Sequence, residues 1–235
     1  MISAVAFCPQ PPLLVPALAS GAAGELAALR AACSTAIAAL AAPGRSVVVL
    51  GAGEATRSHS PLARGSLAGY GAPLEVNLGA PGGASAMELP LALTVGAWLV
   101  QQTLGPSSGA VGFSVGRAAE QGPTAAELRA LADTDDVALL VMGDGAARRS
   151  PTAPGYFDPR AVPFDDTVLT ALAAGDATVL AALDPLLGLA VLAAGVPAWR
   201  AAGRLLRGRS YQAAVLYADD PYGVAYVVAG WRANG

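Results

Sequence analysis

Short apolar runs alternate with longer segments of helical spacing along most of this chain. The clearest runs are Ile2–Cys8, Ser46–Leu50 and Val137–Met142, and each is followed by a proline or a glycine. Ser46–Leu50 is rich in β-branched residues without a polar interruption, which is typical of a parallel strand that is covered on both faces. We therefore predict strands at all three positions and place the second in the centre of a sheet.

The remaining pattern continues this alternation. Further strands are expected at Leu74–Leu78, Ala110–Val115, Ala213–Tyr217 and Val224–Trp231. Helices are expected at Gly21–Leu40, Ala84–Leu104, Thr124–Ala132, Asp165–Ala174, Thr178–Leu183, Leu186–Ala194 and Ala198–Leu206. This order predicts a single layered α/β domain over residues 1–235, with a mostly parallel central sheet flanked by helices and an antiparallel edge from the last two strands.

Composition and charge limit the classes of protein to which this chain can belong. The chain is 54% hydrophobic and 13% charged, which leaves ample apolar surface for a core. Its net charge is −3 and its arginines form no basic stripe, so nucleic-acid binding is not expected. The uncharged stretches Leu89–Leu104 and Pro185–Trp199 fall short of the roughly 20 apolar residues that span a bilayer, so no membrane segment is expected.

The cysteines and the N-terminal segment indicate in which cellular compartment the protein is expected. Cys8 and Cys33 are the only cysteines, too few for a disulfide framework, and both lie in apolar patterns. No positively charged segment precedes the apolar run Ile2–Phe7, and prolines follow it at once, unlike a signal peptide. The cytoplasm is the expected location.

His59 is the only histidine and the first candidate for chemistry. It lies nine residues after Leu50, on a predicted loop Glu54–Arg64. Loops at the carboxyl ends of parallel strands form the ligand crevice of open α/β sheets. A single histidine excludes a three-histidine zinc site and the iron triad of two histidines and a carboxylate. The alternative is that His59 is a packing or surface residue.

A second group of polar residues follows the strand Val137–Met142. Asp144 stands between two glycines, and Arg148 and Arg149 come next. Two arginines beside a glycine-rich turn could bind a carboxylate or a phosphate. The alternative, equally supported by the sequence, is that they pair with acidic residues such as Asp158 and Asp165.

Two other segments have a simpler explanation. Asp219 begins the segment Asp219–Gly223 and could place a carboxylate at the same edge of the sheet, but a β-turn that starts with aspartate explains it nearly as well. Gly51–Ala52–Gly53 follows a buried strand as a dinucleotide fingerprint would, yet Thr56 stands where the third glycine belongs. We therefore predict a tight turn there.

Several short motifs together resemble the LigB-type family of class III extradiol dioxygenases. They are Cys8–Leu14 after the first strand, His59–Leu62, Met142–Gly145, Pro154–Pro159 and Pro221–Val224. The segment around His59 is most similar to the Memo-like branch. The similarity spans nearly the whole chain, although each motif is short.

The resemblance implies a LigB-like α/β domain whose cleft holds non-haem Fe(II). Two histidines and a glutamate bind the iron in active members, and a further histidine acts as acid and base while a catechol ring is opened with O₂. In this sequence His59 matches the second metal histidine, and Gln10 stands where the first belongs. Ala146 or Ala147 occupies the acid/base position, and the glutamate should fall near Leu186–Leu187. The neutral oxygen of Gln10 is a poor replacement for imidazole on Fe(II).

Three hypotheses follow. The first is a LigB-type protein that has lost Fe(II), needs no cofactor and binds a small molecule or a protein. The second is a non-haem, Fe(II)-dependent dioxygenase with a site rebuilt from His59, Gln10 and a carboxylate such as Glu54. The third is a metal-free enzyme that uses His59 and the two arginines on an anionic substrate. Residues expected around a ligand are Gln10, Asp144, Arg148, Arg149 and Asp219. Because the family often forms oligomers, the resemblance also implies a homodimer.

Overall fold

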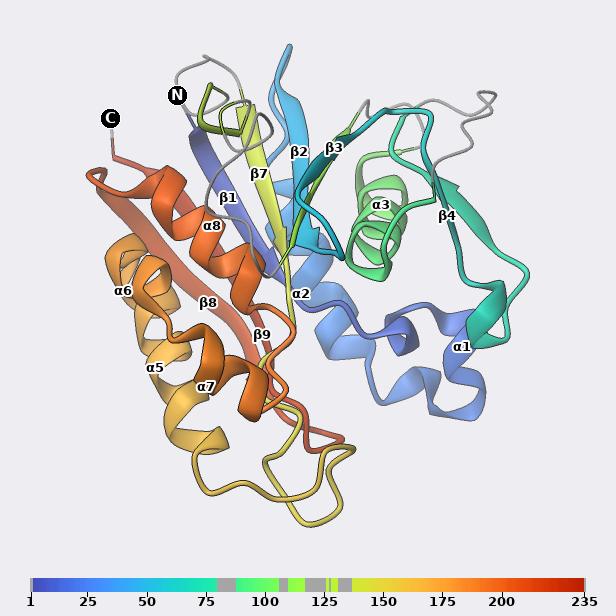
Figure 1. Ribbon diagram of the computed structural model, residues 1–235. Helices are drawn as coiled ribbons and strands as arrows, with labels where there is room; N and C mark the ends of the chain where they lie inside the picture. The colour runs from blue at the N-terminus through green and yellow to red at the C-terminus, as the bar shows by residue number, and fades with distance from the viewer. Residues whose placement is uncertain are drawn as a thin grey trace.

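The computed structural model describes residues 2–79, 88–105, 110–116, 126, 128–130 and 137–234. In these ranges the chain forms a sheet in the order β3-β6-β2-β7-β1-β9-β8 and a small sheet of β4 and β5 (Figure 1). The strands are β1 Ile2–Cys8, β2 Ser46–Ala52, β3 Arg57–His59, β4 Arg64–Ser66, β5 Glu75–Asn77, β6 Val111–Val115, β7 Val137–Met142, β8 Tyr211–Asp219 and β9 Tyr226–Ala233. The helices are α1 Pro16–Ala19, α2 Ala27–Ala38, α3 Leu91–Leu104, α5 Ala161–Ala174, α6 Ala177–Ala182, α7 Pro185–Ala190 and α8 Val196–Leu206.

The centre of the large sheet is parallel and both of its edges are antiparallel. β6, β2, β7 and β1 run in the same direction. β9 and β8 close one side antiparallel, and β3 closes the other. The predicted α/β class, with a mostly parallel sheet and an antiparallel closing pair, is confirmed.

Helices cover both faces of the sheet. α2 and α3 lie on one face, while α5, α6 and α8 lie on the other (Figure 1). Along β2, Val47 and Val49 join the core under α2 and α3, whereas Val48 and Leu50 join the opposite core. Because successive side chains of a strand point to opposite faces, the unbroken apolar run of β2 fills both cores.

Several predicted boundaries need correction. The segment 21–40 begins as a 3₁₀ turn, and α2 starts only at Ala27. α3 starts at Leu91, directly after Pro90, because proline is disfavoured in the interior of a helix, and the predicted start at Ala84 lies outside the described residues. α5 starts at Ala161, four residues before the predicted start. The predicted helix Thr124–Ala132, with its cap Thr124, lies largely outside the described residues.

Gly51 belongs to a strand and not to a turn. β2 continues through Gly51 to Ala52, past the predicted end at Leu50. A Cβ atom on Gly51 would come within 2.5 Å of the Cβ of Ala92, so this glycine lets α3 pack closely against β2. The predicted tight turn at Gly51–Ala52–Gly53 is therefore wrong.

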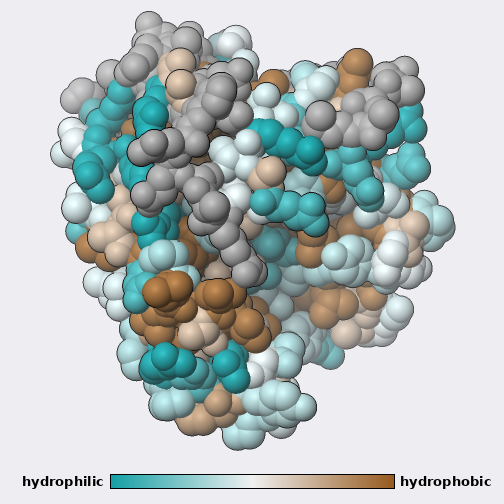
Figure 2. All heavy atoms as spheres, viewed as in Figure 1, coloured by the Kyte–Doolittle hydropathy of each residue, from teal (hydrophilic) through white to brown (hydrophobic). Residues whose placement is uncertain are grey.

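One part of the surface is apolar. Tyr156 and Phe157 on the loop before α5, and Leu186, Leu189 and Leu192 on and after α7, are exposed. Figure 2 shows apolar side chains gathered over the region of α7. No helix in the described ranges is both long enough and apolar enough to cross a bilayer.

Candidate functional site

Gln10 and Asp144 meet at the carboxyl edge of the parallel strands. β1 and β7 pair in register up to Cys8 and Met142, so the residues that follow them lie at the same edge. The backbone N–H of Gln10 donates a hydrogen bond of 2.7 Å to Oδ1 of Asp144. Two of the residues expected around a ligand are thus brought together.

The two glycines beside Asp144 allow close contacts. Gly143 packs directly against Gly195, whose N–H donates to the carbonyl oxygen of Asp144 at 2.9 Å. A Cβ on Gly145 would lie 2.7 Å from the Cβ of Ala225. Larger residues at either position would push the neighbouring segments away, so the glycines fix the position of Asp144.

Tyr226 is a member of the site that the sequence did not reveal. Ala225 exchanges two backbone hydrogen bonds with the segment after Asp144, to Gly145 at 2.8 Å and to Ala146 at 3.1 Å, which places Tyr226 beside it. Burial raises the pKa of Tyr226 far above its usual value, and the negative charge of Asp144 raises it further. Tyr226 is buried, and its hydroxyl has no hydrogen bond to any described residue.

The site also contains an acceptor without a partner. The side-chain oxygen Oε1 of Gln10 is buried and accepts no hydrogen bond from the described residues. Burial raises the pKa of Asp144 to about 7, against the opposing effect of the N–H of Gln10. Buried polar atoms in folded proteins are nearly always hydrogen-bonded, so an unpaired oxygen needs an explanation.

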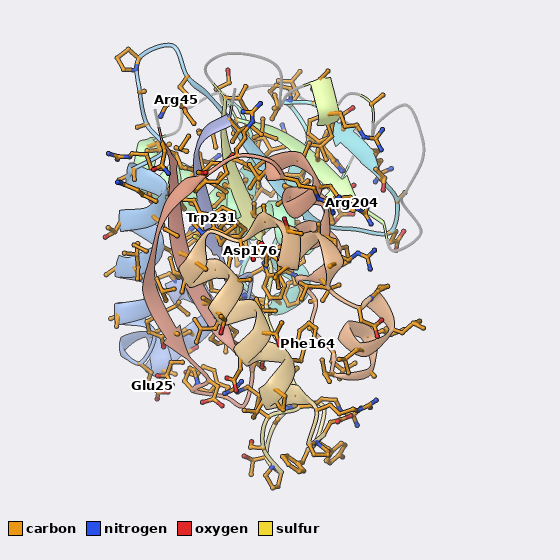
Figure 3. All side chains as sticks on the ribbon, turned by 90° about the vertical axis from the view of Figure 1, so that its left-hand side faces the viewer. Glu25, Arg45, Phe164, Asp176, Arg204 and Trp231 are labelled. Atoms are coloured by element: carbon orange, nitrogen blue, oxygen red, sulfur yellow. The ribbon has the colours of Figure 1, made fainter. Side chains whose placement is uncertain are left out.

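Further carboxylates lie at this edge. The hydroxyl of Tyr222 donates to Oε2 of Glu25 at 2.9 Å. Figure 3 shows Glu25 at the end of the molecule opposite Arg45, which precedes β2. Asp219 is the exposed last residue of β8, and its Oδ1 accepts the N–H of Asp220 at 2.8 Å. The β-turn starts one residue later, since the carbonyl oxygen of Asp220 accepts the N–H of Gly223 at 2.9 Å. A surface hollow of about 600 Å³ lies between the loop after β7 and the turn after β8, and its lining includes Ser150, Asp220 and Tyr222.

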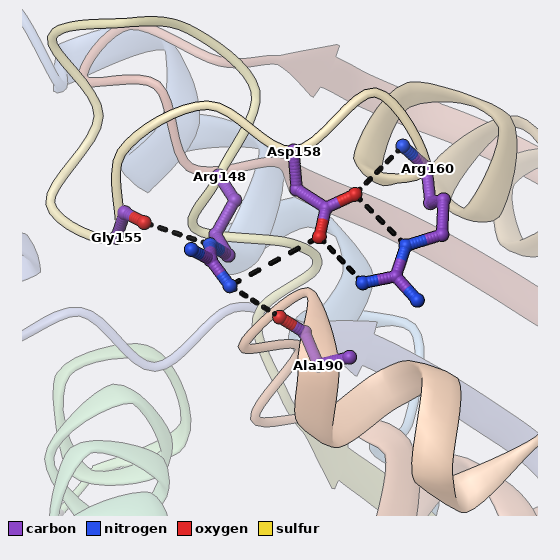
Figure 4. A network of polar contacts seen from close by, with 5 residues as sticks. All are labelled: Arg148, Gly155, Asp158, Arg160 and Ala190. Atoms are coloured by element: carbon purple, nitrogen blue, oxygen red, sulfur yellow. Dashed lines mark hydrogen bonds and ion pairs between the residues drawn. The ribbon is translucent and has the colours of Figure 1, made fainter.

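Arg148 holds the loop before α5 in place (Figure 4). Its Nε donates to the carbonyl oxygen of Gly155 at 2.7 Å, and its Nη1 donates to that of Ala190 at 2.9 Å. Asp158 lies 4.0 Å from Nη1 and pairs more closely with Arg160, which lowers the pKa of this carboxyl to about 2. Arg148 therefore connects the loop to the end of α7.

The guanidinium of Arg149 also donates its hydrogen bonds to neighbouring residues. Its Nε donates to Asp220 at 2.7 Å, and its Nη1 donates to the buried Asp165 at 2.8 Å. The other oxygen of Asp165 accepts the N–H of Ala146 at 2.9 Å. The pairing of the arginines with Asp158 and Asp165, one of the two alternatives from the sequence, is what the structure shows. An anionic ligand would have to displace these bonds.

His59 lies elsewhere in the molecule. The predicted loop Glu54–Arg64 contains β3, which runs antiparallel along β6 and places His59 opposite Gly112. The prediction of a loop position at the carboxyl edge is therefore wrong. The physical reason is that the outer side of β6 needs hydrogen-bond partners, and Arg57–His59 folds back to supply them.

The surroundings of His59 keep it neutral. The ring atom Nε2 lies 2.9 Å from Oγ of Ser114, which itself donates to the carbonyl oxygen of Ala55 at 2.7 Å. Nε2 is therefore the donor, and Nδ1 is a buried acceptor without a partner. Burial, assisted by the positive charge of Arg57, lowers the pKa of His59 to about 4.

The residues present do not fit the Fe(II) site that the resemblance implies. Ligands of one ion lie within a few ångströms of each other, but β3 and β1 are four strand positions apart, which corresponds to roughly 19 Å. In the acid/base position Ala146 is buried and apolar, and Leu186 stands where the glutamate belongs. Within the described residues, no three His, Cys, Asp or Glu side chains come together as a metal site would require.

Comparison with known proteins supports the fold alone. No protein-family model and no curated sequence matches the chain. Among solved structures, the chain is similar to an uncharacterized protein from Escherichia coli K12, with a TM-score of 0.53 and 14% identity over 98% of this chain and 99% of that chain. A likeness at this level of identity shows a shared α/β architecture and carries no activity across.

Proposed function

We propose that this chain is a small-molecule-binding protein with a LigB-type fold that acts without the iron of that family. The observation that carries the proposal is the buried Oε1 of Gln10, which has no partner and belongs to the residue that holds the carboxylate of Asp144. An unsatisfied buried polar atom costs the folded state about 1–3 kcal/mol. A bound ligand with a hydrogen-bond donor would remove that cost.

Two further observations support the proposal. A surface hollow lined by Tyr222 lies at the turn after β8, which is at the same edge of the sheet as Gln10 and Asp144, although neither of these two residues lines it. The residues that the resemblance would assign to iron are spread over the sheet, with His59 on β3 and Gln10 after β1. A binding role needs only the first of these features, whereas ring opening by the family's chemistry needs the iron ligands together.

Metal content is the first test. The protein is purified under anaerobic conditions, its metals are measured by elemental analysis, and O₂ consumption with catechol is followed. We expect far less than one transition metal per chain, the same result for His59→Ala, and no ring opening. Near-stoichiometric iron together with catechol cleavage would overturn the proposal.

The variant Gln10→Met tests the unpaired oxygen itself. Methionine has nearly the same size and no strong acceptor, so we expect the ligand-free variant to be more stable than the wild type by about 1 kcal/mol in urea unfolding. A destabilised variant would mean that the amide already has its partners within the protein. In that case the central observation would be lost.

A rebuilt metal site at His59 is the alternative function. It is favoured by one observation, the buried lone pair of Nδ1 that no described residue satisfies. This alternative predicts that Fe(II), Mn(II) or Zn(II) raises the melting temperature of the wild type and not of His59→Ala. Equal responses of the two proteins would count against it.

A further inference from the structure

Three oxygen atoms of the Gln10–Asp144 edge can accept hydrogen bonds from a ligand. Gln10 contributes Oε1, which is unpaired and buried. Among the described residues, the carboxylate of Asp144 accepts a hydrogen bond only at Oδ1, from the N–H of Gln10, so Oδ2 is open to a ligand. Tyr226 contributes a hydroxyl oxygen without a hydrogen-bond partner in the described ranges. A ligand that satisfies all three must offer several donors in one place.

The charges around the site favour a cation. Asp144 lies in the site, and Glu25 and Asp219 lie on the same edge of the sheet. The two arginines nearest in sequence direct their bonds elsewhere: Arg148 toward backbone carbonyl oxygens, and Arg149 toward two aspartates. A carboxylate or phosphate ligand would meet negative charge here.

We propose that the ligand bound at this edge carries a primary ammonium group, held by Oε1 of Gln10, the carboxylate of Asp144 and the hydroxyl oxygen of Tyr226. An ammonium has three donors and no acceptor, which matches three acceptor oxygens one to one. It also places a positive charge against the half-buried carboxylate of Asp144. This inference rests on the proposed small-molecule-binding function and names the chemical class of its ligand.

Three probes of similar size separate the possibilities. They are cyclohexylmethylammonium, cyclohexylmethanol and cyclohexanecarboxylate, titrated into the full chain at fixed ionic strength, with binding measured by calorimetry and by NMR shifts. We expect the ammonium probe to bind at least about tenfold more tightly than the alcohol, because a charged hydrogen bond to a carboxylate is worth more than a neutral one. The carboxylate probe should not bind.

Matched variants locate the binding. Asp144→Asn removes one negative charge and should weaken the ammonium probe at least about tenfold. Glu75→Gln removes the same charge from an exposed pair with Arg64 on the small sheet and should leave the affinity unchanged. Circular dichroism and urea unfolding of both variants show whether they are folded, so a loss of binding by Asp144→Asn is not confused with unfolding.

Each outcome has a distinct meaning. If the alcohol or the carboxylate binds as tightly as the ammonium probe and Asp144→Asn weakens it, the ammonium inference is overturned while small-molecule binding at this edge stands. If the ammonium probe does not bind, or binds Asp144→Asn and the wild type equally, the inference is overturned as well. The proposed function is then judged separately, by the stability of Gln10→Met and by the metal content.

Discussion

His59 and Asp144 are ionisable groups beside the same parallel strands, and their surroundings differ in kind. His59 is 2% exposed and lies on β3 opposite Gly112 of β6, where a Cβ on Gly112 would come within 2.7 Å of Leu78 and 3.4 Å of His59. Asp144 is partly exposed at the carboxyl edge, stands between two glycines and accepts the backbone N–H of Gln10, whose side-chain oxygen has no partner among the described residues. One group is enclosed by packed side chains, and the other is partly exposed to solvent.

The comparison shows that the residue that stands out most in a sequence need not lie in the candidate ligand site. His59 was the most conspicuous residue in the sequence, because it is unique and follows a central strand. The structure places it within a strand pair, where a neutral imidazole bonded to Ser114 fills the space between neighbours. The open edge is instead built from glutamine, aspartate and tyrosine, which are common residues with no distinctive spacing.

We expect the largest effect on stability from Asp165, which holds the segment that follows Asp144. Asp165 is 5% exposed, accepts the N–H of Ala146 and pairs with Arg149. Asp165→Ala leaves a buried N–H unsatisfied and a guanidinium with only one of its two carboxylates. We expect the free energy of unfolding to fall by about 3–5 kcal/mol in urea titrations.

The matched control removes an acidic partner from an exposed arginine. Glu75→Ala breaks the pair with Arg64, in which both side chains are largely in solvent, and should cost less than about 1 kcal/mol. Similar losses for Asp165→Ala and Glu75→Ala would show that the Arg149 cluster does not support the edge.

The packing around His59 gives the next largest effect. Gly112→Ala would force its new methyl group against Leu78 and toward His59, and we expect a loss of up to about 3 kcal/mol. Gly69→Ala is the control, because a Cβ there meets nothing within 4 Å. Equal melting temperatures for the two variants would mean that the region of His59 is open and would revive it as a ligand site.

The sequence predicted the layers of the fold well, for a physical reason. A strand covered on both faces needs an unbroken apolar run, and β2 and β7 show this pattern directly. β3 was missed because Arg57, Ser58 and His59 have no strand pattern of their own. Their pairing is imposed by the free edge of β6, which is a property of the assembled sheet.

The site was predicted less well than the fold. Gln10 and Asp144 were found because residues that follow parallel strands meet at one edge. Tyr226 was missed because it looks like any residue of the closing strand, and only the bonds of Ala225 to the turn after Asp144 bring it into the site. The roles of Arg148 and Arg149 stayed open in the sequence because their partners lie up to 71 positions away.

A pH titration of stability sharpens the comparison further. The pKa of Asp144 is raised from 3.8 to about 7, so the folded state favours the protonated form. Its contribution to stability is complete below pH 4 and is lost as the pH rises toward 7. Relative to Asp144→Asn, the wild type should lose on the order of 2 kcal/mol of unfolding free energy between pH 4 and pH 7. A difference that does not change with pH would mean that this carboxyl is fully solvated.

His59 should show the opposite slope with a smaller amplitude. Its pKa is lowered from 6.5 to about 4, so the folded state favours the neutral ring. Its contribution is complete above pH 6.5 and is lost as the pH falls toward 4, because the unfolded chain then binds a proton that the folded chain refuses. Relative to His59→Gln, the wild type should lose on the order of 1 kcal/mol of unfolding free energy over that range.

Because the two groups titrate in overlapping pH ranges with opposite signs, the stability of the wild type alone should change little with pH. Each single variant should expose the slope of the other group, and parallel profiles for both variants would show that the two environments do not differ.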